Sequence, residues 1–486
     1  MSDETDLAWL FDLDRDSGEL ERQIYRRILG AVLDQRLKPG ARLPASRKLA
    51  EELGVSRGTV VGAYDQLIAE GYLEAQTGRG TTVASLPPHL LADAAQTAGS
   101  GPQPPTAQGV GAMMELTTSG GIRPRCFPLG IPDLDVFPRR EWTRCLIARV
   151  RRLQTSDLTY DNAAGLPILR QALIEYLNRA RGVVADPEQV VVVPSAQAAF
   201  AAVADAAIDP KDAVAVEDPG YRNARNILAA NGASLLPIHV DDEGIDTDRL
   251  AKHDAFRVVA VTPSHQFPTG VTMSLKRRLQ LLEIARARRA YILEDDYDSE
   301  FRYTERPIAS LQGLGNGDNV VYVGTFSKSL APGLRVAYLV APPHLAPILA
   351  ATIAGKGQIV PAVVQAAMAD FITEGYLAAH IGRMRAIYGK KRDTLVAALR
   401  AALPDTIPVD PPRGGLQMLL KLPAGTNDVG LVDELAAEGI ATRPLSGLTI
   451  RSRERGLLLG FALPKLDEID AAARRMGEVV RARLGG

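Results

Sequence analysis

Residues 320–335 have the sequence VVYVGTFSKSLAPGLR, and this stretch decides the fold. The run Val320–Val323 predicts a buried strand, and the glycine and small polar residues that follow it predict where the strand ends. Lys328 and Arg335 are therefore expected just beyond the end of a sheet. A lysine in that place can form an imine with an aldehyde cofactor, and an arginine nearby can bind a phosphate.

Outward from this stretch, the chain contains further short apolar runs, most of them followed by a helical pattern such as Lys276–Arg289. Continuous apolar strands separated by helices indicate a largely parallel sheet that is covered on both faces. Such sheets bind ligands beyond the carboxyl ends of their strands. The further runs are Val190–Val193, Ala213–Val216, Val258–Val261 and Tyr291–Leu293.

Two of these runs are followed by polar residues that suit the same kind of cofactor. Glu294-Asp295-Asp296-Tyr297 follows one run, and a carboxylate there can stabilise a protonated pyridine nitrogen. Ser195-Ala196-Gln197 follows another and begins a helix, whose free N–H groups suit a phosphate. Each feature alone is common on protein surfaces. Together with Lys328 and Arg335, they supply the contacts that pyridoxal phosphate requires.

The N-terminal part of the chain predicts a helix-turn-helix. Leu20–Leu33 carries apolar residues on one helical face. Ser46 is expected to cap a second helix, Arg47–Leu53, and Ser56 a third. The short turn Leu53–Ser56 between the last two helices gives the geometry of helix-turn-helix proteins.

A β-hairpin is predicted after the third helix, as a wing. Its strands are Gly71-Tyr72-Leu73 and Thr81-Thr82-Val83, and Gly78-Arg79-Gly80 makes the turn. Small polar and basic residues at the front of the third helix suit entry into the major groove of DNA. A small helical dimerisation or lid domain is the alternative interpretation.

Charge and composition divide the chain into three parts. Residues 1–19 contain seven acids and one base, whereas residues 20–83 contain ten Lys or Arg and seven acids. This pattern is compatible with DNA contact but also with an ordinary solvated surface. Residues 85–121 are rich in Pro, Gly, Ala, Gln and Thr, which predicts a linker. The expected domains are 1–84, the linker, and 122–486.

The overall composition is that of a soluble globular protein, with 46% hydrophobic and 23% charged residues among 486. The sequence has no apolar run of membrane-spanning length, and its acidic start differs from a signal peptide. The two cysteines, Cys126 and Cys145, imply no disulfide framework. We therefore expect a cytoplasmic protein, and we predict no metal site.

Residues 43–73 resemble the GntR family of transcription regulators. The similar runs are LPASRKLA from residue 43, LGVSRGTV from residue 53, Ala63-Tyr64 and EGYL from residue 70. At Val61 this family often has arginine, so no DNA contact is assigned there. The resemblance implies DNA contacts at Arg47, Ser56, Arg57, Thr59 and the wing tip Gly78.

Residues 122–482 resemble fold-type I aminotransferases. The resemblance implies that Lys328 forms the imine, that Asp295 is the partner of the pyridine nitrogen and that Tyr221 stacks on the ring. It also places Tyr297 beside the ring 3-oxygen. The residues implied to hold the phosphate are Ala196, Gln197, Thr325, Ser327 and Arg335, with Tyr160 reaching the phosphate of the partner subunit in a homodimer.

A GntR-type head joined to such a body is the layout of the MocR subfamily, which the runs TPSHQFPTG (262–270) and EDDYDSEFRY (294–303) also resemble. The layout implies a multi-domain protein. An α+β winged helix-turn-helix domain precedes an α/β domain with a mostly parallel sheet. Members of this subfamily bind a DNA operator. Some sense pyridoxal phosphate itself, and others respond to small amines.

Two positions depart from the aminotransferase pattern. Phe267 stands where an asparagine is usual, so the hydrogen bond to the ring oxygen must come from His265, Gln266 or Tyr297, or be missing. Leu458 stands where an arginine usually binds the substrate carboxylate. Arg443 is either a substitute charge or a plain surface arginine.

Three functional hypotheses follow. The first is a DNA-binding regulator that senses pyridoxal phosphate, alone or with a small amine. The second is a working aminotransferase with an accessory DNA-binding head, and the third is a degenerate body that serves only as a dimer scaffold. The winged segment and Leu458 favour the regulator, because transamination needs an oriented substrate. The presence of Lys328, Asp295 and Arg335 disfavours the scaffold.

Overall fold

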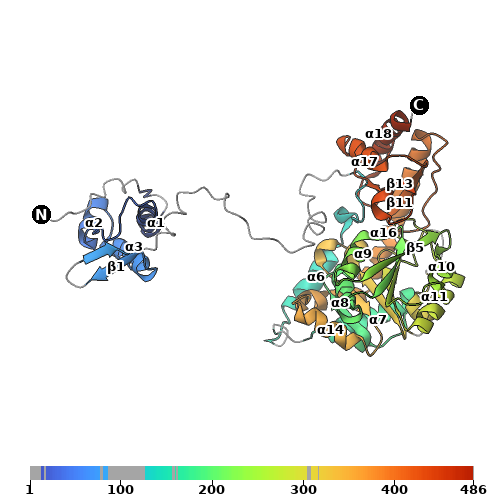
Figure 1. Cartoon of the computed structure of the whole chain (residues 1–486), viewed down its shortest axis with the longest axis horizontal. Helices are drawn as coiled ribbons and strands as arrows, with labels where there is room; N and C mark the ends of the chain where they lie inside the picture. Colours follow the sequence, from blue (N-terminus) through green and yellow to red (C-terminus); the bar gives the residue numbers. More distant parts are fainter. Residues whose placement is uncertain are drawn as a thin grey trace. The chain divides into compact units, whose positions relative to one another are not determined.

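The computed structural model describes residues 13–15, 18–76, 80–85, 126–155, 159, 162–303, 308–315 and 317–484. They belong to two compact units, one within residues 1–118 and the other within 119–486 (Figure 1). We call the first unit the head and the second the body. The predicted linker, residues 85–121, lies outside the described residues except for Ser85.

The head consists of three helices and an antiparallel hairpin. The third helix begins where Ser56 Oγ accepts a hydrogen bond from the Thr59 amide at 3.1 Å, as predicted. Ile28, Val60 and Leu67 are fully buried between the helices. The elements are α1 (Leu20–Leu33), α2 (Ser46–Leu53), α3 (Arg57–Ala69), β1 (Leu73–Gln76) and β2 (Gly80–Val83).

Two local predictions for the head were wrong. Ser46 does not cap α2 but is its first residue, because the Leu49 amide bonds to the Ala45 carbonyl one position earlier. The first strand begins at Leu73 rather than at Gly71, because Gly71 has a left-handed φ of 82° and ends the preceding helix. The predicted wing tip, Gly78, lies outside the described residues.

The body is built on an eight-stranded sheet of order β3-β10-β9-β8-β7-β4-β5-β6. The five strands from β9 to β5 are parallel to one another, while β10 and β6 run antiparallel to their neighbours. The prediction of a mostly parallel sheet is confirmed. The strands are β3 (Val190–Val193), β4 (Ala213–Asp218), β5 (Ser234–Asp241), β6 (Gly244–Ile245), β7 (Val258–Val261), β8 (Tyr291–Asp296), β9 (Val320–Thr325) and β10 (Ala337–Val340).

Helices cover both faces of this sheet. Along β3, Val191 and Val193 pack into one apolar core, and the alternating Val190 and Val192 pack into another. The first core contains residues of α8 (Ala196–Ala207), α9 (Arg222–Ala229) and α14 (Ala346–Gly355). The second contains residues of α6 (Arg139–Val150), α7 (Pro167–Arg181) and α15 (Ala362–Thr373). Beneath β7 and β8, a third core contains residues of α10 (Thr247–Ala251), α11 (Leu275–Arg288) and α12 (Leu311–Leu314).

The C-terminal part of the body is a second, smaller layer. Its sheet has the order β11-β13-β12, with β11 (Gln417–Leu422), β12 (Arg443–Pro444) and β13 (Arg455–Gly460) all antiparallel. It packs on α16 (Tyr376–Ala402), α17 (Asp428–Ala437) and α18 (Leu466–Leu484), which form one apolar core with it (Figure 1).

Three strands of the large sheet are longer than the sequence predicts. β4 continues to Asp218, β8 to Asp296 and β9 to Thr325. The polar residues at these ends still pair with neighbouring strands, as Asp296 does with Gly324. The polar groups therefore lie on rigid strand ends rather than on loops. Over the ranges that the structure describes, no helix is long and apolar enough to cross a membrane.

The close packing of Gly324 against Tyr338 gives a test of this sheet. A Cβ at Gly324 would lie 2.4 Å from the Tyr338 ring, on the strand paired with it. We expect Gly324→Ala to lower the free energy of unfolding of the body by about 1–3 kcal/mol, because the core is overpacked. Urea denaturation followed by circular dichroism measures this. Gly333→Ala is the matched control, since nothing lies within 4 Å of its added Cβ. Equal unfolding midpoints for the two variants would contradict the packing.

Candidate functional site

Strand pairing gathers the predicted phosphate ligands at one edge of the large sheet. Ala337, the first residue of β10, pairs with Val193 on one side and with Thr325 on the other. The start of α8 follows Val193, and Arg335 lies just before Ala337. Three segments far apart in the sequence therefore end beside one another.

The first of these segments is the N-terminus of α8. Ser195 caps this helix by accepting a hydrogen bond from the Ala198 amide at 3.1 Å. The first amide bonded within the helix is that of Ala199, so those of Ala196 and Gln197 have no acceptor in the helix. These N–H groups and the positive end of the helix dipole suit an anion.

The other two segments are the end of β9, which carries the hydroxyls of Thr325 and Ser327, and the residues before β10, which include the guanidinium of Arg335. The Thr325 hydroxyl donates to Ser327 Oγ at 3.0 Å and accepts from the Ser327 amide. Arg335 has a left-handed φ of 53°, and its side chain is exposed. Within the described ranges its guanidinium makes no hydrogen bond or ion pair, so it is free to bind a phosphate.

Lys328 lies on the short helix α13 (Phe326–Ser329), directly after β9. Its Nζ donates to the Gly130 carbonyl at 2.6 Å, and a Cβ at Gly130 would lie 2.6 Å from Nζ. Glycine at this position therefore leaves room for the amine. Burial lowers the pKa of Lys328 below its ordinary value, opposed in part by Asp298 and Asp295. A larger share of the amine is then neutral and nucleophilic near neutral pH.

Asp295 lies at the end of β8 and lines a cavity with Tyr221 and Glu217. Burial, together with the negative charges of Asp296 and Glu217, raises the pKa of Asp295 to about 8. Its carboxyl therefore holds a proton at neutral pH. An acid in this state can share its proton with a pyridine nitrogen placed in the cavity.

Tyr221 stands at the start of α9 and forms one wall of this cavity. The side chains of Gln197 and Asn223 lie close enough to its hydroxyl to oppose the rise in its pKa that burial causes. Its ring makes edge contacts with Phe267 at 5.6 Å and Phe200 at 6.4 Å between centroids. These contacts hold the ring at the cavity wall, where the predicted stacking on a flat cofactor can take place.

Glu217 was missed by the sequence analysis. Its Oε2 accepts from the Thr262 hydroxyl at 2.6 Å and from Gln266 Nε2 at 3.1 Å. Its Oε1 has no hydrogen-bond partner among the described residues, and burial raises its pKa to about 7. An acid inside the apolar run before Asp218 was the only signal in the sequence.

The hydrogen bonds around His265, Gln266 and Tyr297 decide which of these three side chains can bond to the 3-oxygen of the cofactor ring. Gln266 Nε2 also donates to the backbone carbonyls of Pro219 and Phe267, and Gln266 Oε1 accepts from Thr269. Both the nitrogen and the oxygen of the Gln266 side-chain amide are therefore already hydrogen-bonded within the protein. Of the three candidates, Gln266 is therefore excluded, which leaves His265 and Tyr297.

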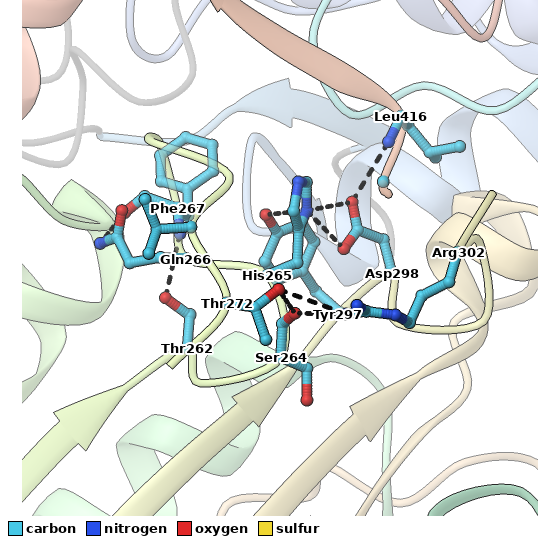
Figure 2. A network of polar contacts seen from close by, with 12 residues as sticks. Thr262, Ser264, His265, Gln266, Phe267, Thr272, Tyr297, Asp298, Arg302 and Leu416 are labelled. Atoms are coloured by element: carbon cyan, nitrogen blue, oxygen red, sulfur yellow. Dashed lines mark hydrogen bonds and ion pairs between the residues drawn. The ribbon is translucent and has the colours of Figure 1, made fainter. Parts of the chain in front are cut away.

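Tyr297 is the better placed of these two. Its hydroxyl lies 3.1 Å from His265 Nδ1, and the same nitrogen lies 3.0 Å from Asp298 Oδ1 (Figure 2). A carboxylate only accepts, so Nδ1 carries a hydrogen and donates it to Asp298. The hydroxyl hydrogen of Tyr297 then remains available for another acceptor. Asp298 is itself fixed by the Leu416 amide at 3.3 Å.

The two departures from the aminotransferase pattern lie in one apolar cluster. Leu458 is fully buried there, and Phe267 packs against the cluster. Arg443 lies opposite Leu458 on the neighbouring strand, and its side chain is exposed. Apolar side chains therefore surround Leu458, the residue that we predict to stand in place of a carboxylate-binding arginine.

The predicted DNA contacts lie on α2 and at the front of α3. Arg57 is the first residue of α3 and is exposed, and Arg47 is exposed on α2. The Ser56 hydroxyl is 2.8 Å from the Thr59 hydroxyl, so both are partly used in capping the helix. Tyr160, predicted to reach the partner subunit, lies outside the described residues, as Gly78 does.

Together, these groups fit pyridoxal phosphate. The phosphate can be held by Arg335 and by the free amides at the start of α8, and Lys328 has an amine with a lowered pKa. Asp295 supplies a proton beside the cavity. In the part of the chain that is described, no group of three or more His, Cys, Asp or Glu side chains could hold a metal ion.

Comparison with known proteins agrees with this two-part organisation. The family model for aminotransferase class I and II matches residues 127–476. The family model for bacterial regulatory proteins of the gntR family matches residues 20–83. The body is also similar to the crystal structure of Pyrococcus horikoshii kynurenine aminotransferase in complex with PMP. That match has a TM-score of 0.71 at 26% identity and covers 78% of this chain and 96% of that one.

Two full-length relatives combine both parts. The chain is 38% identical over 454 residues to the probable rhizopine catabolism regulatory protein MocR of Rhizobium meliloti, covering 93% of this chain and 92% of that protein. It is 33% identical to the pyridoxine biosynthesis transcriptional regulator PdxR of Corynebacterium glutamicum, covering 91% of each. The chain therefore belongs to the MocR-type regulators of the GntR family, in which a helix-turn-helix head precedes an aminotransferase-like body.

Proposed function

We propose that this protein is a DNA-binding transcription regulator whose body carries pyridoxal phosphate on Lys328. Its DNA binding responds to the cofactor itself or to the cofactor together with a small amine. The observation that carries this proposal is the presence, in one chain, of an exposed Arg57 on a capped helix and of free groups suited to the cofactor. We assign residues 1–84 to the head, 85–121 to a linker and 122–486 to the body.

When bound, pyridoxal phosphate would supply an aldehyde that condenses with a lysine amine, with loss of water, and a ring that withdraws electrons from the C=N bond so formed. Lys328 provides the amine, and its lowered pKa favours the neutral form that attacks an aldehyde. Asp295 holds the proton for the ring nitrogen, and Tyr297 offers its hydroxyl hydrogen to the ring oxygen. Arg335, Thr325 and the start of α8 bind the phosphate.

A homodimer completes this account. The proposed role of Tyr160 requires a partner subunit whose phosphate it reaches. Two heads in one dimer can then bind two half-sites of an operator, which raises the apparent affinity if the linkers span them. A protein that acts on an operator works in the cytoplasm.

A working aminotransferase is the second candidate, and the fold favours it. The solved structures that resemble the body include kynurenine aminotransferase. Against it stands Leu458, whose buried side chain fills the position expected for a carboxylate-binding arginine. Without that bidentate, charge-assisted contact, an α-amino acid is not held in one orientation.

The DNA-binding role is tested at Arg57. An arginine that makes a bidentate contact with guanine provides about 1–3 kcal/mol of discrimination. We expect Arg57→Ala to weaken operator binding by about tenfold or more while the absorbance of the bound cofactor stays unchanged. A gel-shift titration at one stated salt concentration measures this. Arg26→Ala on α1 is the control for loss of one exposed positive charge. Equal affinities for wild type and Arg57→Ala would refute the recognition-helix assignment.

The enzyme alternative is tested by turnover. We expect slow or absent transamination between common amino acids and keto acids, because Leu458 offers no partner to a carboxylate. Steady-state assays with the cofactor-loaded protein measure this. Turnover at about 1–1000 per second, the range of ordinary enzymes, would favour the aminotransferase.

A further inference from the structure

The start of the small sheet, of order β11-β13-β12, is held by the segment that follows β8. The chain enters β11 through residues 413–416. Gly415 donates its amide hydrogen to the Phe301 carbonyl at 2.8 Å, and the Gly415 carbonyl accepts from the Tyr303 hydroxyl at 2.6 Å. The Tyr303 amide in turn donates to the Arg413 carbonyl at 3.1 Å. The place where β11 begins therefore depends on the residues that leave the large sheet after β8.

Asp298 belongs to this segment, and its buried carboxylate forms hydrogen bonds on two sides. On one side, Oδ2 accepts from the Leu416 amide at 3.3 Å. On the other side, Oδ1 accepts from His265 Nδ1 at 3.0 Å (Figure 2). A buried carboxylate is unfavourable unless its oxygens are hydrogen-bonded, so both contacts are needed to keep Asp298 in place.

The position of the His265 ring depends on Asp298. Nδ1 is the ring nitrogen that contacts Asp298, and it also lies 3.1 Å from the Tyr297 hydroxyl. The other ring nitrogen, Nε2, is buried and has no hydrogen-bond partner among the described residues. The imidazole is therefore held through one of its two nitrogens, and a displacement of Asp298 reaches the Tyr297 hydroxyl.

The small sheet also packs directly on the His265–Asp298 pair. A Cβ added at Gly415 would lie 2.6 Å from Asp298 Oδ2 and would overlap the His265 ring. Gly415 has a left-handed φ of 75°, which glycine adopts readily. Because groups packed this closely cannot move independently, a displacement of the pair also displaces the start of β11.

Asp298 acts on the cofactor lysine through its charge as well. Burial lowers the pKa of Lys328, and the negative charge of Asp298 is the largest effect that opposes it. One carboxylate is thus close to both groups that we expect to contact the cofactor on this side. These are the amine of Lys328 and, through His265, the hydroxyl of Tyr297.

We propose that Asp298 is a positioning residue that links the bound cofactor to the small sheet. When the Tyr297 hydroxyl donates to the ring oxygen, Tyr297, His265 and Asp298 are fixed from the cofactor side. The hydrogen bond from the Leu416 amide to Asp298 then opens less often. This inference rests on the proposed function and deepens it, because it names the contacts through which the cofactor changes the body.

Hydrogen exchange of the full chain, measured by mass spectrometry with and without pyridoxal phosphate, tests this proposal. Two segments are compared. Residues 414–422 contain the start of the small sheet, and residues 196–203 contain the start of α8, where we expect the phosphate to bind. In the wild type, the cofactor should slow exchange in both segments by about fivefold or more, since fixing a hydrogen-bonded network lowers the frequency of its local opening.

Two variants break the link at different places. Asp298→Asn introduces an NH2 group that in either orientation faces a donor, His265 Nδ1 or the Leu416 amide. Tyr297→Phe removes the hydroxyl between the cofactor and His265 but leaves the contacts of Asp298 in place. In both variants, the cofactor should slow exchange in residues 196–203 but not in residues 414–422. Should Asp298→Asn fail to fold, Tyr297→Phe decides the question.

Asp218→Asn is the matched control. Asp218 is also a buried carboxylate at the end of a strand of the large sheet, and it accepts from the backbone amides of residues 450–452, just before β13. These contacts do not involve His265 or Tyr297. The control variant should therefore keep the wild-type response to the cofactor in both segments.

The proposal is overturned if the cofactor slows exchange in residues 414–422 of Asp298→Asn or Tyr297→Phe as much as in the wild type. It is also overturned if Asp218→Asn loses that response, or if the wild type responds in residues 196–203 alone. A wild type that responds in neither segment would instead overturn the proposed function, on which the inference rests, because no cofactor would then be bound at the site.

Discussion

The pairing of β10 with both β3 and β9 is the constraint on which the cofactor site depends. β10 runs antiparallel between strands that are far apart in the sequence, and its first residue, Ala337, touches both of their carboxyl ends. That arrangement brings the capped start of α8, the hydroxyls after β9 and the free guanidinium of Arg335 to one edge. The phosphate of this cofactor is a monoester that carries about two negative charges on three acceptor oxygens, and it needs donors from several directions at once. A loop alone does not supply them, whereas the ends of β3 and β9 and the start of β10, held together by two hydrogen-bonded ladders, do.

The same edge also concentrates acidic groups, and the structure gives each a different environment. Asp296 forms an ion pair with Arg181, and Glu294 accepts hydrogen bonds from two backbone amides at the start of α12. Asp295 lines the cavity instead, where burial and neighbouring negative charges raise its pKa to about 8. Lys328 is shifted in the opposite direction by its own burial. The site thus holds an acid with a raised pKa, which can give its proton to a pyridine nitrogen, and an amine with a lowered pKa, which suits attack on an aldehyde.

The strands and the order of polar motifs could be predicted because both are local properties of the sequence. A run such as Val190–Val193 is apolar along its whole length, and Lys328 follows such a run directly. The contacts that could not be predicted are nonlocal. Nothing near Gln266 in the sequence indicates that Glu217 and Pro219 would occupy its amide. The capping error at Ser46 has a smaller cause, since one residue of register decides whether a hydroxyl caps a helix or lies inside it.

The central claim is that cofactor bound at Lys328 controls the DNA affinity of the head. The most direct measurement is the fluorescence anisotropy of labelled operator at one salt concentration, with and without pyridoxal phosphate. Wild type, Lys328→Ala and the surface control Lys276→Ala are compared. The cofactor is predicted to change the affinity for the operator by about fivefold or more in the wild type and in Lys276→Ala, a size typical of allosteric coupling. The operator affinity of Lys328→Ala should be the same with and without the cofactor. A cofactor response of the same size in Lys328→Ala, or no response in the wild type whether or not a small amine accompanies the cofactor, would contradict it.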